Sequence, residues 1–305
     1  MHSNRKFGKI AVTGASGFLG QNLCSYLEDG GYDISKYSRR DFPGFEKVNY
    51  FDHHQLAERL DGIETIVHLA GIAHNPSSSI DKSAYKNAIY DTSLNLLNAA
   101  LATGCKRIIF ASTCKVYGES SGNAILSEDS MCRPLTPYGI MKLKIEDELM
   151  RVRQQIHINI LRFPPIYGAG MRGAIKYLFK AARYYLPLPV ESFEHNRTFL
   201  SIENAVRFIE AGVRGNLETP ILIPHEGQPT SVGKFYTYLW LAAHDENMPE
   251  TLHWKLPGGI KSALEHLRLL EPLFRPFAMR SKHRIDSNML ALVAPIDSMR
   301  KFFHG

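Results

Sequence analysis

The sequence predicts an α/β fold: a Rossmann-type, doubly wound parallel sheet with helices on both faces. Through the first half of the chain, short apolar runs alternate with amphipathic stretches, which is the pattern of successive βα units. A glycine-rich turn stands directly between the first apolar run and the first amphipathic stretch. After residue 168 this alternation ends and prolines become frequent, which predicts a smaller, mostly helical C-terminal substrate lobe.

The individual elements follow from the spacing of apolar residues. Buried strands are expected at 9–14, 32–37, 47–52, 64–71, 105–113 and 157–163. Helices are expected at 18–29, 80–103 and 138–154. One more strand is expected to return to the sheet at 220–227. The first domain would therefore comprise residues 1–168 with this returning strand, and residues 169–305 would form mainly the substrate lobe.

Composition limits the class of protein. The chain has 305 residues, 44% hydrophobic and 22% charged, as in ordinary globular proteins. The net charge of +6 is spread along the chain without a basic block, so we expect no nucleic-acid partner. The 4 cysteines lack CxxC and metal-ligand spacing, which predicts reduced thiols and no metal site. Neither a signal peptide nor a membrane span is recognisable, so a soluble, cytoplasmic protein is expected.

The glycine-rich turn has the spacing of a phosphate cradle. Gly14 permits a tight turn, Gly17 lets the backbone approach a pyrophosphate, and Gly20 allows close packing of helix on strand. The free N–H groups of the following helix would face the anion. Because strand, turn and helix come in this order, the segment predicts a dinucleotide site. Its expected cofactor-binding residues are Gly14, Ser16, Gly17, Phe18, Leu19 and Gly20.

The end of the second strand bears on the choice of cofactor. An Asp or Glu there would hydrogen-bond the ribose 2′-hydroxyl of NAD. This strand ends instead in Ser38, followed by Arg39 and Arg40. Since arginine binds phosphate through paired hydrogen bonds, these three residues predict that NADP(H) is favoured over NAD(H).

Tyr138 and Lys142 form a YxxxK pair at the start of a predicted helix, with Thr136 as its N-cap and Pro137 as its first residue. Residues four apart share a helix face, so both side chains can reach one ligand. A nearby positive charge favours the phenolate form of tyrosine. Tyr138 is therefore expected to act as general acid or base at an oxygen that is, or becomes, a carbonyl.

These motifs resemble the extended short-chain dehydrogenase/reductases. The GxxGxxG turn, the segment FASTCKVYG at 110–118 and the YxxxK pair follow one another along the chain in the order found in that superfamily. The resemblance implies that the Thr113 hydroxyl reaches the same substrate oxygen as Tyr138. It also implies further cofactor contacts along the sheet edge. They are Asp52, His53, Leu69, Ala70, Gly71, Ala111, Ser112, Tyr138, Lys142 and Pro164.

The segments FASTCKVYGES, LRFPPIYGAG, LPLP and NRTFLSIENAV together resemble the nucleotide-sugar epimerase/4-ketoreductase branch. The resemblance is to UDP-4-keto-6-deoxy-HexNAc 4-reductases and to UDP-galactose 4-epimerases. It implies that Arg197 binds the diphosphate of a nucleotide sugar, with Arg280 or Arg284 as a second contact. It also implies a homodimer formed through the helices at 80–103 and 136–154.

The chain departs from the branch at three places. Cys114 and Lys115 stand where 4,6-dehydratases carry Asp and Glu, which argues against elimination of water. Ile89 takes the place of an Asn in the crossover helix, although Asn87 is near. The Asn that many epimerases use after the sixth strand falls at 164–165, both prolines, which weakens assignment as a galactose epimerase.

The first hypothesis is therefore an enzyme that reduces a nucleotide-linked 4-ketohexose with NADP(H), in the synthesis of bacterial surface polysaccharides. Tyr138 would protonate the oxygen, Thr113 would polarise the carbonyl, and Lys142 would lower the pKa of the tyrosine. The alternative is an NAD-dependent UDP-hexose or UDP-HexNAc 4-epimerase, which would use the same catalytic residues. A non-catalytic dinucleotide sensor is a third hypothesis, disfavoured because the Tyr/Lys pair is present.

Overall fold

A computed structural model describes residues 7–71, 82–171, 173–250, 254–255, 257, 275–283, 290 and 292–304. The chain divides into two compact units. The first comprises Met1–Gly118, Met131–Phe163 and Ala205–Leu222; the second comprises Glu119–Ser130, Pro164–Asn204 and Ile223–Gly305. Within the described residues, no helix is long and apolar enough to cross a membrane.

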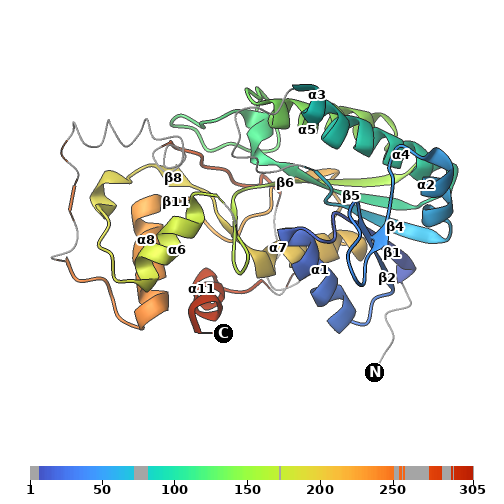
Figure 1. Cartoon of the computed structure of the whole chain (residues 1–305). Helices are drawn as coiled ribbons and strands as arrows, with labels where there is room; N and C mark the ends of the chain where they lie inside the picture. Colours follow the sequence, from blue (N-terminus) through green and yellow to red (C-terminus); the bar gives the residue numbers. More distant parts are fainter. Residues whose placement is uncertain are drawn as a thin grey trace. The chain divides into compact units, whose positions relative to one another are not determined.

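The first unit contains a seven-stranded parallel sheet in the order β10-β6-β5-β4-β1-β2-β3 (Figure 1). The strand order reverses between β1 and β4, which is the switch point where such sheets bind ligands. This architecture confirms the predicted Rossmann-type fold. The strands are β1 (Lys9–Thr13), β2 (Ile34–Ser38), β3 (Glu46–Lys47), β4 (Ile63–His68), β5 (Arg107–Thr113), β6 (His157–Phe163) and β10 (Ile221–Leu222).

Helices cover both faces of this sheet (Figure 1). On one face lie α2 (His53–Leu60), α4 (Thr92–Ala102) and α5 (Pro137–Arg151). Their apolar side chains share one buried core with the strands, in which Phe110 of β5 is completely buried. On the other face lie α1 (Phe18–Asp29) and the part of α7 (Ile202–Val213) that belongs to this unit. The Cβ of an alanine at Gly212 would lie 2.9 Å from Ile109 Cγ1, so α7 approaches the sheet closely.

Three predicted elements differ from the structure. The strand expected at 47–52 is observed as Glu46–Lys47 only, and Asp52 instead caps α2 by accepting the Gln55 N–H at 3.0 Å. The strand expected at 220–227 pairs with the sheet only through Ile221–Leu222.

The helix expected at 80–103 is three consecutive segments over its described part. They are α3 (Lys82–Tyr85), a π-helical stretch (Lys86–Asp91) and α4. The backbone N–H of Thr92 bonds the carbonyl of Asn87, five residues earlier, and the Thr92 hydroxyl donates to the same oxygen at 2.8 Å. This i−5 pairing widens the helix in a way that apolar spacing does not reveal.

The second unit is helical apart from short strands. β7 (Ile166–Tyr167) pairs with β9 (Leu200–Ser201), and β8 (Asn196–Arg197) pairs with β11 (Thr230–Ser231). The helices are α6 (Ile175–Arg183), α8 (Val232–His244) and α11 (Pro295–His304). Aromatic rings join them: the centroid of Phe179 lies 6.4 Å from that of Phe235 and 4.6 Å from that of Phe302. A mostly helical C-terminal region was predicted.

Candidate active site

The turn after β1 and the turn after β4 are in close contact. Gly14 has φ +68°, and a Cβ at this position would lie 2.7 Å from the backbone nitrogen of Ala70. A Cβ at Gly20 would lie 2.3 Å from the Gly14 carbonyl oxygen. Both contacts are with backbone atoms that cannot rotate away, so only glycine fits at either position. The predicted roles of Gly14 in turning and of Gly20 in helix packing therefore have a steric basis.

The N-terminus of α1 is suited to an anion. Gly17 is the N-cap and contributes no side-chain hydrogen bond, so none of the first N–H groups of α1 is capped by it. The first turn contains no acidic residue that would repel a phosphate. Phe18, Leu19 and Gly20 supply this turn, as the sequence predicted. These observations fit the pyrophosphate of a dinucleotide.

His68 connects three elements of the sheet edge and remains neutral. Its Nδ1 lies 2.6 Å from the Thr13 hydroxyl of β1, and its Nε2 lies 2.7 Å from the Ser93 hydroxyl of α4. Burial, with a smaller contribution from the charge of Lys142, lowers the pKa of His68 to about 3. His68 therefore has a structural role and links β4 to β1 and α4. The next residue, Leu69, donates its N–H to the Thr13 carbonyl at 3.1 Å.

The end of β2 carries no carboxylate. Ser38 is buried; its hydroxyl lies 3.3 Å from the Ser16 hydroxyl and accepts the Arg40 N–H at 3.2 Å. The side chains of Arg39 and Arg40 are exposed. Asp52 and His53 are exposed at the start of α2, where the Asp52 carboxylate serves as the N-cap.

The three predicted catalytic residues meet at the end of β5. Tyr138 and Lys142 lie on α5, which begins as predicted: the Thr136 hydroxyl accepts the Gly139 N–H at 3.2 Å, and Pro137 is the first helical residue. The side chain of Thr113, the last residue of β5, lies near enough to Tyr138 to lower the pKa of its phenol.

Lys142 is held against the same strand. Its Nζ donates to the Ala111 carbonyl at 2.7 Å and lies 4.4 Å from the centroid of the Phe110 ring. A Cβ at Gly71 would lie 3.7 Å from this Nζ, so the turn after β4 also reaches the ammonium group. The trio and the glycine turns thus occupy one edge of one sheet.

Burial dominates the protonation of this group. It raises the pKa of Tyr138 well above its ordinary value, while the hydrogen bond with Thr113 opposes the rise. Burial lowers the pKa of Lys142 to about 8, and the Glu146 carboxylate opposes that change. The phenol is therefore protonated at neutral pH and can donate a proton. Acting as a base requires additional positive charge beside it.

Two of the departures noted in the sequence have structural correlates. Ile89 is fully buried, and its Cγ1 would lie 4.0 Å from a Cβ at Gly71, whereas Asn87 is exposed. Ile89, not Asn87, therefore faces the active-site edge. Cys114 is buried next to Thr113, and a thiolate there would raise the pKa of Tyr138 further.

Sequence reasoning missed a buried ion pair behind the trio. Arg162 of β6 donates through Nη2 to Glu146 of α5 at 2.7 Å, and both side chains are almost fully buried. The Ser112 hydroxyl also donates to Glu146. Two signals were available in the sequence: a charged residue, Arg162, within a predicted buried strand, and Glu146 four residues beyond Lys142 on the predicted helix.

The predicted substrate arginines belong to the second unit. Arg197 is 7% exposed, its guanidinium donates to the Arg275 carbonyl, and it lies 5.8 Å from the Phe277 ring centroid. Arg280 is exposed and donates to Gln228 at 3.4 Å. Arg284 lies outside the described residues. Pro164, a predicted cofactor contact, is buried.

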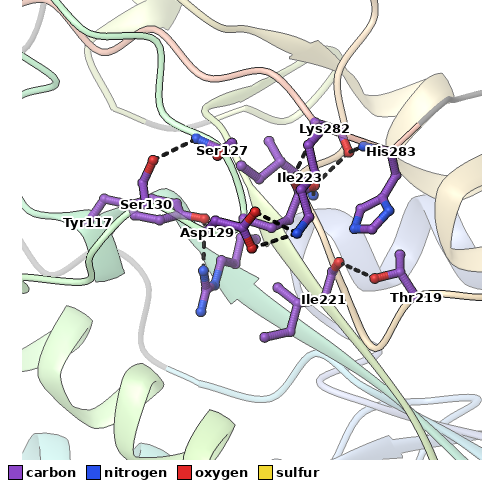
Figure 2. Close-up of polar contacts among 12 residues, drawn as sticks. Tyr117, Ser127, Asp129, Ser130, Thr219, Ile221, Ile223, Lys282 and His283 are labelled. Atoms are coloured by element: carbon purple, nitrogen blue, oxygen red, sulfur yellow. Dashed lines mark hydrogen bonds and ion pairs between the residues drawn. The ribbon is translucent and has the colours of Figure 1, made fainter.

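The segment that contains Arg280 is anchored by acidic residues within its own unit. Glu128 accepts hydrogen bonds from the Ser281 hydroxyl at 2.6 Å and from the Lys282 N–H at 3.0 Å. The Lys282 ammonium pairs with Asp129, with Nζ 2.5 Å from Oδ1 (Figure 2). These contacts hold residues 280–282 at a defined place in the second unit.

Comparison with known proteins places these observations in context. Residues 10–215 match the model of the NAD dependent epimerase/dehydratase family. An uncharacterized UDP-glucose epimerase, YtcB, of Bacillus subtilis is 31% identical over 255 residues, 74% of this chain and 76% of its own. The UDP-glucose 4-epimerase of Vibrio cholerae is 28% identical over 272 residues, 84% of this chain and 81% of its own.

A solved structure supports the fold. The UDP-glucuronic acid 4-epimerase of Bacillus cereus, in complex with NAD, superposes with a TM-score of 0.71 at 22% identity. The match covers 97% of this chain and 95% of that one.

The contact between Gly20 and Gly14 leads to a first prediction. Gly20→Ala should push the glycine turn away from α1, lowering dinucleotide affinity by about 10-fold or more and stability by roughly 1–3 kcal/mol, the usual cost of overpacking. Isothermal titration with NADH and urea unfolding would measure the two effects. Gly30→Ala, at the other end of α1 where the nearest atom is the Tyr32 ring at 3.1 Å, is the matched control. Equal affinities of both variants would contradict the steric argument.

Proposed function

The chain belongs to the NAD dependent epimerase/dehydratase family, and from this premise we propose that it is a 4-epimerase of a UDP-linked hexose or N-acetylhexosamine. It is an extended short-chain dehydrogenase/reductase. The observation that carries the proposal is the trio of Thr113, Tyr138 and Lys142 on the sheet edge that also bears the glycine cradle. The UDP-glucose epimerase relatives support a nucleotide-sugar substrate.

The geometry suits chemistry at a sugar hydroxyl. NAD, when bound, accepts a hydride from carbon and later returns it. Tyr138 would take the proton of the C4 hydroxyl when the sugar is oxidised, and Thr113 would hydrogen-bond the same oxygen. When the 4-keto sugar is reduced on its other face, Tyr138 would give the proton back to that oxygen. The net reaction inverts C4 and consumes no cofactor.

Lys142 has two roles in this mechanism. Its charge, together with that of the oxidised nicotinamide, favours the phenolate that Tyr138 needs in order to act as a base. Its ammonium group, which donates to the Ala111 carbonyl, would also hydrogen-bond the nicotinamide ribose of a bound NAD. We also propose a homodimer, on the resemblance alone, formed through the helical regions 80–103 and 136–154.

A reductase of a nucleotide-linked 4-keto sugar is the second candidate. It is favoured by one observation, the absence of a carboxylate at Ser38 beside the exposed Arg39 and Arg40. A reductase must exchange its spent cofactor, and NADPH would suit these guanidinium groups. The comparisons support the epimerase better than this reading, which the sequence had placed first, and the family description names NAD.

The catalytic prediction tests the enzyme class directly. The unmodified protein with NAD should interconvert UDP-glucose and UDP-galactose, or the corresponding N-acetylhexosamines, as followed by chromatography. Tyr138→Phe should retain cofactor binding but lose about 100-fold or more in turnover, because a positioned acid–base group is removed. If the protein instead consumes only a 4-keto sugar together with NADPH, it is a reductase and the epimerase proposal is wrong. Undiminished turnover in Tyr138→Phe would remove this residue from the mechanism.

The cofactor prediction concerns the end of β2. Ser38→Asp combined with Arg39→Asn should shift the ratio of NADH to NADPH affinity toward NADH by about 10-fold or more. A carboxylate accepts a hydrogen bond from the 2′-hydroxyl and repels a 2′-phosphate. Titration of both cofactors against both proteins measures this ratio. In the unmodified protein, tighter binding of NADPH would favour the reductase, and tighter binding of NADH would favour the epimerase. An unchanged ratio in the variant would show that Ser38 and Arg39 do not contact the ribose.

The substrate prediction concerns Arg197. A partly buried, charge-assisted hydrogen bond contributes about 1.5–3 kcal/mol, so Arg197→Ala should weaken UDP binding by roughly 10- to 100-fold. Affinity for NADH should stay within about 2-fold of that of the unmodified protein. Circular dichroism must show that the variant is folded, since Arg197 also bonds the Arg275 carbonyl. Arg183→Ala, an exposed arginine of α6, is the control. Unaltered UDP affinity would exclude Arg197 as the diphosphate contact.

A further inference from the structure

The buried Glu146–Arg162 ion pair has no role in the scheme above. Glu146 is 2% exposed and Arg162 is 4% exposed. Arg162 meets one carboxylate oxygen with two donors, Nη2 at 2.7 Å and Nε at 3.1 Å from Glu146 Oε2. Removing two charges from water is costly, and such a pair is weak evidence for stability by itself. Stability alone therefore does not explain why Glu146 and Arg162 are buried together between α5 and β6.

The ion pair joins the elements that carry the catalytic trio. Glu146 lies on α5, one turn beyond Lys142 and two turns beyond Tyr138. Its carboxylate accepts a hydrogen bond from the Ser112 hydroxyl, next to Thr113 in β5. Arg162 donates from Nη1 to the Tyr117 hydroxyl at 2.8 Å, in the turn that follows Thr113. One carboxylate and one guanidinium thus tie the catalytic helix to both sides of Thr113.

The same carboxylate is the negative charge on α5 that acts on Lys142. The titratable groups facing Lys142 are Glu146 and Tyr138 on its own helix and His68 on β4, which is neutral. Arg162 on β6 donates to Glu146, and Tyr117 in the turn after β5 accepts from Arg162. Burial lowers the pKa of Lys142 and Glu146 raises it, to a balance of about 8.

We propose that Glu146 and Arg162 are positioning residues of the active site. The pair fixes α5 against the end of β5, so that Tyr138 and Thr113 meet at one oxygen, and Glu146 supplies the charge that balances the buried Lys142 ammonium. Arg162 in turn holds Glu146 in place. This inference rests on the proposed function for its kinetic consequence, and its geometry is independent of the substrate.

The variants must separate an electrostatic role from a merely structural one. Glu146→Gln keeps the shape of the side chain and removes the charge opposite Lys142. Arg162→Met removes the partner but leaves the carboxylate. A structural role predicts similar losses of stability in both variants and no change at Lys142. The proposal predicts a fall in the pKa of Lys142 in Glu146→Gln and no fall in Arg162→Met. Glu148→Gln, on the same helix but bonded to the exposed Arg151 side chain, is the control.

The decisive measurement is an NMR titration of the protein with isotopically labelled lysine side chains, with Lys142→Met assigning the resonance. In Glu146→Gln the pKa of Lys142 should fall by about 1 unit or more, because an opposite charge at short range shifts a pKa by roughly 1–3 units. In Arg162→Met it should stay or rise. The control should leave it unchanged. An unaltered value in Glu146→Gln, or equal falls in both variants, would overturn the proposal.

Kinetics provides the second readout. Because the protonated Lys142 is the active form, turnover should fall as pH rises through its pKa, and Glu146→Gln should move this alkaline limb to lower pH by the same amount as in the NMR titration. The KM for the UDP-sugar should change little, since Glu146 does not touch it. Glu146→Asp keeps the carboxylate and should therefore displace the alkaline limb less than Glu146→Gln does. A uniform loss of turnover without any displacement of the limb would indicate a structural role only.

The two experiments distinguish this inference from the proposed function. The NMR titration needs no substrate, so a fall in the pKa of Lys142 supports the role of Glu146 even if no UDP-sugar is turned over. Turnover of a UDP-sugar with an unchanged pKa in Glu146→Gln would support the epimerase and dismiss the positioning pair.

Discussion

The close approach of two backbone turns is the constraint on which the site depends. The strand order reverses between β1 and β4, so the chain leaves these neighbouring strands in opposite directions and opens a crevice at their carboxyl ends. The turns meet there with no room for a Cβ at Gly14, and α1 starts with no room for one at Gly20. These contacts bring an uncapped helix N-terminus to the crevice, where an anion can replace the missing acceptors.

Charge burial shapes the chemistry beside this crevice. Lys142 is almost fully buried, as are Glu146 and Arg162, and the three side chains together carry one excess positive charge. Desolvation alone would deprotonate the lysine and keep the tyrosine neutral. The Glu146 carboxylate on α5 opposes the fall in the pKa of Lys142. The Thr113 hydroxyl opposes the rise in the pKa of Tyr138. Burial still dominates at Tyr138, whose pKa stays above its ordinary value, so its action as a base requires further positive charge beside it.

The trio does not by itself select one reaction. Oxidation and reduction at a sugar carbon use the same hydrogen bonds, so an epimerase and a 4-ketoreductase share Thr113, Tyr138 and Lys142. What separates them is whether the cofactor is retained and whether the keto sugar has room to turn over. The first depends on the end of β2, where Ser38 is tied to Ser16 and to the Arg40 N–H. The second depends on the residues that surround the sugar.

Local patterns in the sequence determined most of the first unit. Apolar spacing predicted the central strands, glycine spacing predicted the cradle, and Thr136 with Pro137 predicted the start of α5, because each depends on residues adjacent in the chain. Apolar spacing did not reveal the π-helical stretch or the early end of β3, although their contacts, Thr92 with Asn87 and Gln55 with Asp52, lie within five residues. Tertiary structure decided the Glu146–Arg162 pair, because its partners are distant in the chain. No local pattern records that Arg162, 16 residues from Glu146, would find its carboxylate across a buried sheet face.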